Sequence, residues 1–287
     1  MTIQHGTTMA AILSLVLLAG PAATLASAAE TADQRVAQPL VIGETFTIES
    51  AALGETRRIN VYLPAGYAEH PETRVSVLYM PDGGIGEDFL HVAGLMQVLM
   101  GNGTMRTFML VGIENTQRRR DLTPPTVNPK DREIAPTVGG SAKFRAFIRD
   151  ELMLEVARRY RTSDETAIVG ESLAGLFVVE TFLVAPNMFD HYLAFDPSLW
   201  WNDAKLLDTV TPMFRAHPDM KKTLWLASSG ERDIAVLAAR LGETLEGGAP
   251  AGLRWRYVPM PAEQHSTIYH PAALQAFRDV FAPPSSK

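Results

Sequence analysis

The sequence has no cysteine in 287 residues, and this absence removes several kinds of site at once. A disulfide framework, a thiolate nucleophile, a lipoprotein anchor and a cysteine-ligated zinc or iron–sulfur centre are all excluded. The patterns H-E-x-x-H and G-x-x-x-x-G-K-[ST], which bind zinc and nucleotide phosphates, are also missing. We therefore expect a protein that uses no metal and no cofactor and that keeps any activity in excess chelator.

Positive charge is scarce as well. The formal net charge is -6, and the one basic cluster, at residues 118–120, is followed directly by Asp121. A protein that binds a polyanion normally carries a basic patch or stripe. We therefore predict that nucleic acid is not a partner.

Long hydrophobic runs are limited to the N-terminal region, where residues 10–20 are apolar. This run is shorter than the roughly 18 residues that a membrane-spanning helix needs, and the Ala-Ser-Ala at residues 26–28 is typical of a signal-peptide cleavage site. No Lys or Arg precedes the run, so the positive charge of this leader rests on the terminal amine. We predict a secretory signal peptide at residues 1–28, a mature chain from Ala29, no stable membrane span, and a periplasmic or secreted location.

After a polar segment at residues 29–39, strand-like runs alternate with helix-like patterns. This alternation is typical of a mostly parallel sheet covered by helices on both faces, and we predict one α/β domain over residues 40–287. The first two strands are expected to form an antiparallel pair. Strands are expected at 44–49, 57–63, 75–79, 108–113, 167–169, 192–195, 223–227 and 254–258, and helices at 89–100, 141–160, 173–184, 204–215, 234–245 and 271–281.

The clearest helical pattern lies at residues 141–160, where apolar residues recur every four positions from Phe144 to Tyr160. The longest stretch without periodicity is the polar segment at 114–140. Loops of this length are commonly functional, so we place the segment at the rim of a site.

A candidate nucleophile lies between a strand-like and a helix-like run, in the stretch Gly170 to Gly175 (G-E-S-L-A-G). A serine hydroxyl is a poor nucleophile unless a base takes its proton and fixed donors stabilise the oxyanion. One architecture presents the serine on a strained strand-to-helix turn flanked by small residues. Ser172 has this context, although Ala174 interrupts the usual G-x-S-x-G. The alternative is that Ser172 caps the following helix.

Partners for this serine are expected after later strands, in the chain order serine, acid, histidine. The segment after the strand at 223–227 contains Glu231 and Asp233, and the segment after the strand at 254–258 contains His265 and His270. His265 is the expected base, because His270 immediately precedes a proline at a helix start. Asp233 is the expected acid that orients the imidazole. Glu231 remains an alternative, and so does a helix-capping role for both carboxylates.

The oxyanion needs two backbone amides. One is expected at Leu173, directly after the nucleophile, and the other at Gly83 in the glycine-containing loop after the third strand. The same loop has the G-x-G start of a dinucleotide fingerprint at Gly84, but Phe89 occupies the third glycine position. A nicotinamide cofactor is therefore not expected.

With these residues identified, the chain from about Leu40 to Phe281 resembles the esterase family of α/β-hydrolases that includes esterase D and the enterochelin and other siderophore esterases. The resemblance implies an α/β-hydrolase fold and a serine–acid–histidine triad, placed here on Ser172, Asp233 and His265. The blocks that carry it are VYLPAGY, VLYMPDGG, VGIENTQRRRDLTPP, VGGSAKFRAFIRDELMLEVARRYRT, VGESLAGLFVVE, AFDPSLWWND and HPAALQAF.

The family usually reads G-H-S-x-G-G at the elbow, whereas this chain has Glu171 in place of the histidine and Ala174 in place of the first following glycine. Both triad partners remain, so these departures concern the rate and the substrate class. A methyl group at Ala174 is expected to crowd the turn, and the carboxylate of Glu171 to repel anionic substrates.

The resemblance also implies three substrate-binding residues: Arg118 and Arg120, for an anionic or catecholate group, and Trp200 as a pocket wall. The alternatives are ion pairs of the arginines with Asp121 or Glu114, which would contribute little energy at the surface, and burial of the tryptophan in the core.

We therefore expect a serine carboxylic ester hydrolase that acts through an acyl-enzyme on a small-molecule ester, of the siderophore type or a short acyl ester. An acyltransferase with the same triad is one alternative. A binding protein that keeps the fold without turnover is another, because fold alone does not fix function.

Overall fold

The computed structural model describes residues 38–284. The expected signal peptide at 1–28 lies outside the described residues, as does most of the polar segment at 29–39. The chain divides into two units, Met1–Val41 and Ile42–Lys287, and the second holds the helices and strands described below. Within residues 38–284, no helix is both long enough and apolar enough to cross a membrane.

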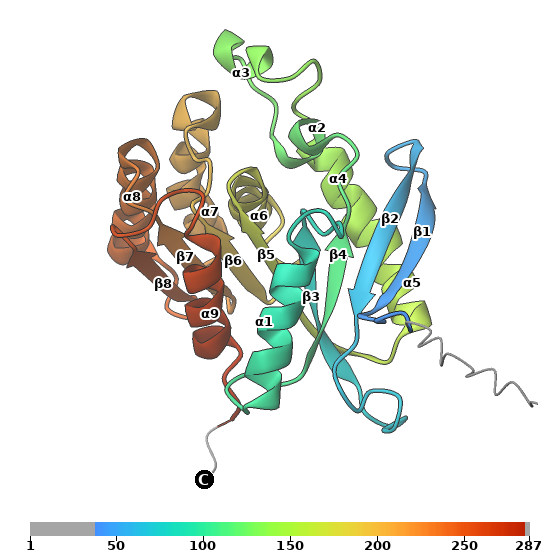
Figure 1. Ribbon diagram of the computed structural model, residues 1–287. Coiled ribbons are helices and arrows are strands. Elements are labelled where there is room, and N and C mark those ends of the chain that lie inside the picture. Colours follow the sequence, from blue (N-terminus) through green and yellow to red (C-terminus); the bar gives the residue numbers. More distant parts are fainter. Residues whose placement is uncertain (1–37, 285–287) are drawn as a thin grey trace, which may run out of the picture. The chain divides into compact units, whose positions relative to one another are not determined.

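In this described part of the chain, one sheet of eight strands has the order β1-β2-β4-β3-β5-β6-β7-β8 (Figure 1). β1 pairs with β2, and β2 with β4, in antiparallel fashion, and all other neighbours are parallel. The α/β fold and its antiparallel start are thus confirmed. The strands are β1 (Glu44–Ser50), β2 (Glu55–Tyr62), β3 (Val75–Pro81), β4 (Phe108–Ile113), β5 (Thr162–Glu171), β6 (His191–Phe195), β7 (Thr223–Ser228) and β8 (Arg254–Pro259).

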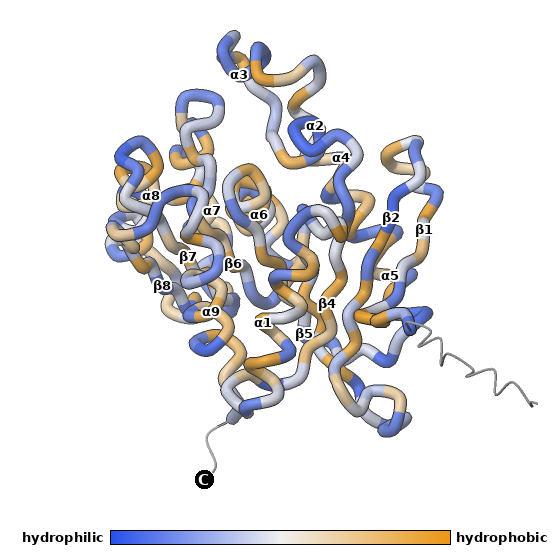
Figure 2. Tube along the Cα trace, viewed as in Figure 1, coloured by the Kyte–Doolittle hydropathy of each residue, from blue (hydrophilic) through white to orange (hydrophobic). Residues whose placement is uncertain are grey.

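The central strands are buried on both faces. Every residue of β3, β4 and β7 is buried, whereas β8 at the edge of the sheet alternates between exposed and half-buried residues. Strands covered on both faces have continuous apolar runs, which explains why VSVLYM and FMLVGI show no alternation in the sequence. Figure 2 shows such a hydrophobic stretch along β4, and hydrophobic residues also along the neighbouring helix α1 (Phe89–Gly101).

Helices cover the two faces of the sheet. The buried side chains of α1 and α9 share one hydrophobic cluster with one face, and those of α4, α5, α6, α7 and α8 share another cluster with the opposite face. The helices are α1 (Phe89–Gly101), α2 (Arg118–Leu122), α3 (Pro129–Glu133), α4 (Ser141–Phe147), the π-helical turn η1 (Ile148–Leu152), α5 (Met153–Arg159), α6 (Leu173–Val184), the 3-10 segment η2 (Trp201–Thr209), α7 (Val210–Ala216), α8 (Arg232–Gly248) and α9 (Tyr269–Val280).

The helix expected at 141–160 contains a π-helical turn, η1, between α4 and α5. In a regular α-helix, positions four apart rotate by about 40° relative to each other, so a strict repeat of four drifts around the helix. The wider π turn offsets this drift and keeps Phe144, Ile148, Leu152 and Val156 in the core, where each is at most 1% exposed.

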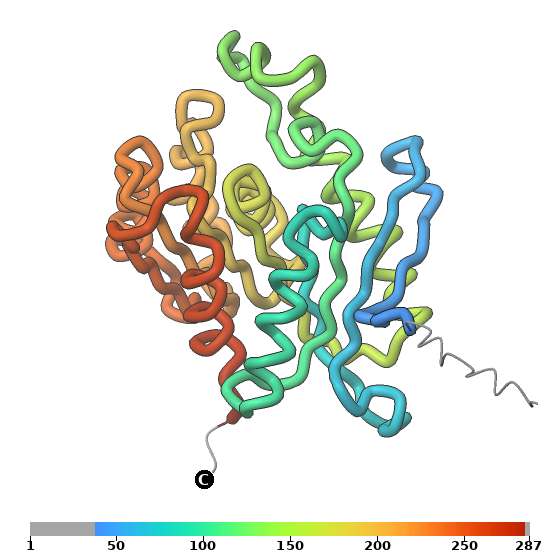
Figure 3. The backbone as a smooth tube through the Cα atoms, in the orientation of Figure 1, coloured from blue at the N-terminus to red at the C-terminus, as the bar shows by residue number. Residues whose placement is uncertain are grey.

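The segment at 114–140 contains two short helices, α2 and α3, which the sequence pattern did not predict. Figure 3 shows this segment in green, projecting beyond the sheet at the top of the view. The expected helix at 204–215 is also divided, into the end of η2 and α7, with the boundary between Thr209 and Val210. The residues before it, Asn202, Asp203 and Ala204, have left-handed backbone conformations.

Candidate active site

The candidate nucleophile lies at a sharp turn between β5 and α6. Ser172 has φ 59° and ψ -120°, a conformation that costs a non-glycine residue about 1–3 kcal/mol. Small neighbours make this turn possible, since a Cβ added to Gly170 would lie 2.7 Å from the Cβ of Ala174. The methyl group of Ala174 therefore fits the turn because residue 170 is glycine.

The side chain of Ser172 makes no capping hydrogen bond to α6. Its Oγ lies 3.0 Å from Nε2 of His265 and 3.5 Å from Oγ of Ser198. A helix cap accepts from backbone amides in the first turn, so the capping alternative does not describe this serine.

His265 lies in the loop between β8 and α9, and its two ring nitrogens contact different partners. Nε2 faces Ser172, and Nδ1 lies 2.7 Å from Oδ2 of Asp196. Asp196 is fully buried, and its other oxygen accepts a 2.6 Å hydrogen bond from the amide of Ser229. Serine, histidine and aspartate thus form one continuous chain of hydrogen bonds.

The acid in this series of hydrogen bonds is Asp196 and not the expected Asp233. Asp233 is exposed in the first turn of α8, and the structure does not place it against the imidazole. Glu231, the alternative, accepts a 3.0 Å hydrogen bond from the backbone amide of His265 and not from its ring. His270 instead pairs with His91, with 2.9 Å between ring nitrogens.

The register of the sheet explains why Asp196 takes this position. Glu171 at the end of β5 pairs with Phe195 at the end of β6, so Ser172 and Asp196 are the next residues of two adjacent parallel strands. Adjacent strands lie about 4.8 Å apart. An acid after β7, as expected, would lie one strand further from the serine. The signal in the sequence was an aspartate directly after a strand, in AFDPSLWW.

The two expected oxyanion donors differ in their surroundings. Leu173 is the first residue of α6, where helix geometry leaves the amides without intrahelical partners and aligned with the positive end of the helix dipole. The amide of Gly83 instead donates to the carbonyl of Ile113 at 3.0 Å, so the structure does not present this amide as the expected second oxyanion donor. A Cβ on Gly83 would lie 2.3 Å from Cα of Gly112, so the glycine is required for close packing of the loop on β4.

The two arginines expected at a substrate group are both engaged in ion pairs. Nε and Nη2 of Arg118 donate to the two carboxylate oxygens of Asp82 at 2.7 and 2.8 Å. Arg120 pairs with Glu55 and with Asp121, each at 2.6 Å. The alternative of an ion pair with Asp121 thus describes Arg120, with Glu55 as a second partner.

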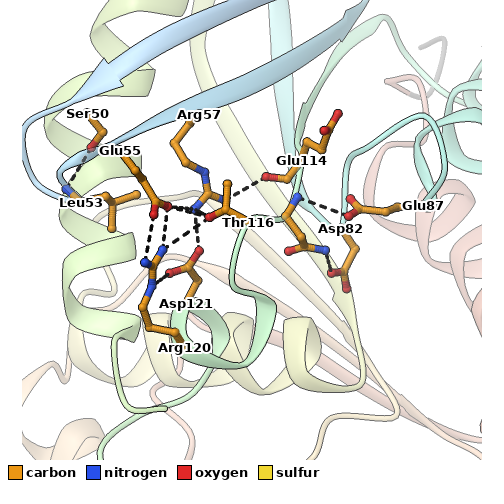
Figure 4. Close-up of polar contacts among 11 residues, drawn as sticks. Ser50, Leu53, Glu55, Arg57, Asp82, Glu87, Glu114, Thr116, Arg120 and Asp121 are labelled. Atoms are coloured by element: carbon orange, nitrogen blue, oxygen red, sulfur yellow. Dashed lines mark hydrogen bonds and ion pairs between the residues drawn. The ribbon is translucent and has the colours of Figure 1, made fainter. Parts of the chain in front are cut away.

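Figure 4 shows Arg120 beside Arg57, which is fully buried and donates to Asp121 at 2.5 Å. Arg57 also donates to the carbonyl of Glu114 at 2.9 Å. Since Arg57 lies on β2, these contacts fasten the start of the 114–140 segment to the sheet. Arg120 therefore helps to hold this segment, since its Nε, Nη1 and Nη2 all donate to carboxylates of Asp121 and Glu55.

The two tryptophans of SLWW differ in exposure. Trp201 is 1% exposed and donates from Nε1 to the carbonyl of Pro124, whereas Trp200 is 36% exposed. Trp200 lines a groove of about 690 Å³ with Glu231, Asp233 and the apolar side chains of α8. One residue of this lining, Glu231, also accepts a hydrogen bond from the backbone amide of His265.

Charges around the imidazole shift the pKa of two groups. The hydrogen bond with Asp196 raises the pKa of His265, and the charges of Glu171 and Glu231 act in the same direction against the opposing effect of burial. Burial raises the pKa of Glu171 to about 8. The site therefore favours a protonated histidine, as is needed when it takes the proton of a serine.

Among the described residues, one group offers three ligand atoms close enough for a metal: Glu171, Asp196 and His265, with ligand atoms within 4.8 Å of one another. Both ring nitrogens of His265 already have partners, at 2.7 and 3.0 Å. A metal would have to displace one of them. The arrangement fits a route for proton transfer better than a metal centre.

Comparisons with known proteins show the family to which the chain belongs. The chain is 36% identical over 99 residues to the ferri-bacillibactin esterase BesA of Bacillus subtilis. This match covers 32% of this chain and 34% of that protein. The chain is also 36% identical over 101 residues to a siderophore enterobactin esterase of Emericella nidulans, covering 32% and 33%. The matches therefore span about a third of the length of these relatives.

Solved structures match over more of the chain. An IroE-like serine hydrolase from Shewanella oneidensis has a TM-score of 0.75 at 30% identity and covers 83% of this chain and 80% of its own. The BES protein from Bacillus cereus has a TM-score of 0.76 at 20% identity, over 86% and 99%, which supports the fold. A family model described as "Putative esterase" matches residues 50–248, more than half of the chain. The chain is therefore a member of this esterase family, with the α/β-hydrolase fold.

Proposed function

We propose that the protein hydrolyses carboxylic esters through an acyl-enzyme, with Ser172 as nucleophile, His265 as base and Asp196 as the acid that orients it. The observation that carries the proposal is the continuous contact from Oγ of Ser172 through both ring nitrogens of His265 to the buried carboxylate of Asp196. Such a chain turns a weak hydroxyl into a nucleophile at neutral pH.

In the first step, Oγ of Ser172 bonds to the ester carbonyl carbon while its proton moves to Nε2 of His265. The carbonyl electrons pass to the oxygen, and the amide of Leu173 at the start of α6 supports this negative charge. The C–O bond of the ester then breaks, and the alcohol leaves with the proton from Nε2. Water, deprotonated by His265, repeats these steps on the acyl-enzyme and releases the acid.

For the substrate, we propose a small ester of the siderophore type or a short acyl ester. The names of the relatives support the first class, since one is a ferri-bacillibactin esterase and another a siderophore enterobactin esterase. The groove beside Trp200 supports a substrate with an apolar or aromatic part, because tryptophan and the aliphatic side chains of α8 line it.

The direct test is hydrolysis of p-nitrophenyl acetate and butyrate by the chain from Ala29, beside Ser172→Ala at equal concentration. Turnover by the wild type, with a fall to the uncatalysed rate in the variant, supports the proposal. A fluorophosphonate probe gives a second measure, since it should add covalently to the wild type and not to Ser172→Ala. A folded wild-type protein that neither hydrolyses these esters nor takes up the probe would overturn the mechanism.

We also propose that the protein acts in the periplasm or outside the cell, on the strength of the leader-like sequence at residues 1–28. The intact mass of the protein recovered from the periplasm or medium tests this. A mass that begins at Ala29 supports export with cleavage, and an uncleaved chain retained in the cytoplasm contradicts it.

A further inference from the structure

Glu171 places a second carboxyl group beside the imidazole. It is the last residue of β5 and directly precedes the nucleophile, so the rigid turn at Ser172 fixes its position. Oε1 of Glu171 lies 3.3 Å from Nδ1 of His265, the same nitrogen that contacts Asp196 at 2.7 Å. The Nδ1 atom of His265 therefore has two carboxyl neighbours, Asp196 and Glu171.

The Oε1 atom of Glu171 makes no hydrogen bond in the described part of the chain. Oε1 of Glu171 is buried and has no hydrogen-bond partner among residues 38–284. A buried polar atom without a partner costs about 1–3 kcal/mol, so its retention needs an explanation. The mechanism described above, in which Asp196 alone faces Nδ1, does not use it.

We propose that Glu171 is a positioning residue that acts through His265, sharing with Asp196 the positive charge that the imidazole gains when it takes the proton of Ser172. This inference rests on the proposed function. Two negative groups near an imidazolium stabilise it more than one, and the effect is strong where water is excluded. No bond to substrate is required of Glu171, and the proton of Nδ1 stays on that nitrogen.

Burial and the charged groups around Glu171 determine the pH range in which its carboxyl is ionised and can stabilise the imidazolium. The pKa of its carboxyl is raised to about 8: burial is the largest cause, the charges of His265 and Arg118 oppose it, and those of Asp196 and Asp82 act with it. Below this pKa, with the histidine neutral, the carboxyl is uncharged and resembles a glutamine. Above it, the carboxylate is available to stabilise the imidazolium, so the contribution of Glu171 increases with pH. The two groups titrate as a coupled pair.

The test compares kcat/KM of the wild type and Glu171→Gln from pH 6 to pH 9, after subtraction of the uncatalysed rate. Glutamine keeps the shape and removes the ionisation. We expect a ratio of wild type to variant near one at pH 6 that rises to about tenfold at pH 9, within the range by which one acid–base group changes a rate. Glu243→Gln, at an exposed position of α8, is the matched control and should give a constant ratio of one.

A wild type that is active while Glu171→Gln gives the same ratio at every pH would overturn the inference and leave the esterase mechanism intact. A wild type no faster than Ser172→Ala would overturn the proposed function itself. If Glu171→Gln lacks a cooperative thermal transition, the variant is not folded, and the pH profile of kcat/KM of the wild type is then used alone. Two ionisations in its rise with pH support the inference, and a single ionisation contradicts it.

Discussion

Replacing Asp196 by asparagine is the sharpest test of the site, because the two oxygens of this buried carboxylate have different partners. One accepts from the amide of Ser229 at 2.6 Å, and the other contacts Nδ1 of His265 at 2.7 Å. An asparagine must turn its carbonyl oxygen toward the Ser229 amide, since its NH₂ group cannot accept that bond. The NH₂ group then faces His265 and forces Nδ1 to act as an acceptor.

The remaining ring proton would then sit on Nε2 and point at Ser172, where the histidine can no longer take the serine proton. We expect kcat/KM to fall by roughly 10³–10⁴-fold, the size known for a wrong histidine tautomer and equal to about 4–5.5 kcal/mol of activation free energy. The pKa of His265 is raised chiefly by its bond to Asp196. Its loss should also move the acid limb of the pH profile of kcat/KM to lower pH.

The assay is p-nitrophenyl butyrate hydrolysis from pH 5 to pH 9 with Asp196→Asn and, as the matched control, Asp233→Asn. Asp233 is exposed on α8, so this control should stay within about twofold of the wild type, as is usual for surface substitutions. A large loss in Asp233→Asn together with a small one in Asp196→Asn would refute the assignment of the acid.

Three further substitutions test the surroundings of the site. Gly83→Ala should abolish activity or folding, because its Cβ would lie 2.3 Å from backbone, whereas Gly86→Ala, with no atom within 4 Å, should leave activity and the thermal midpoint unchanged. Trp200→Ala should raise KM for p-nitrophenyl esters of long or aromatic acids while leaving kcat for the acetate within about twofold, since the side chain lines the groove and not the triad. Arg57→Ala should lower the free energy of unfolding in urea by about 3–5 kcal/mol, as expected when one partner of a buried ion pair is removed. Arg240→Ala, from an exposed pair, should cost less than about 1 kcal/mol, and equal losses for both arginines would contradict the role of burial.

Much of the fold could be predicted from local patterns. Apolar runs such as VSVLYM are long enough to mark buried strands, and their alternation with helices favours a parallel sheet whatever the side-chain contacts are. The chemistry around Ser172 was also visible, because a strained turn requires small residues next to the serine in the sequence itself.

The carboxylate that contacts the histidine was not predictable by the same reasoning. Both Asp196 and Asp233 follow strands, and the sequence alone does not say which strand neighbours β5 or in which register. Only the pairing of Glu171 with Phe195 brings Asp196 beside the serine and leaves Asp233 on the surface of α8.

The sequence by itself thus determined the fold class, the elbow with its serine and the loop that carries the histidine, since each depends on residues close together in the chain. The tertiary structure alone decided which carboxylate lies against the imidazole, the engagement of Arg118 and Arg120 in ion pairs, the exposure of Trp200 and the position of Glu171 beside the imidazole. These features depend on contacts between residues tens of positions apart, such as the 69 positions between Asp196 and His265. No periodicity or spacing in the sequence encodes contacts of that kind, because they follow from strand order and register.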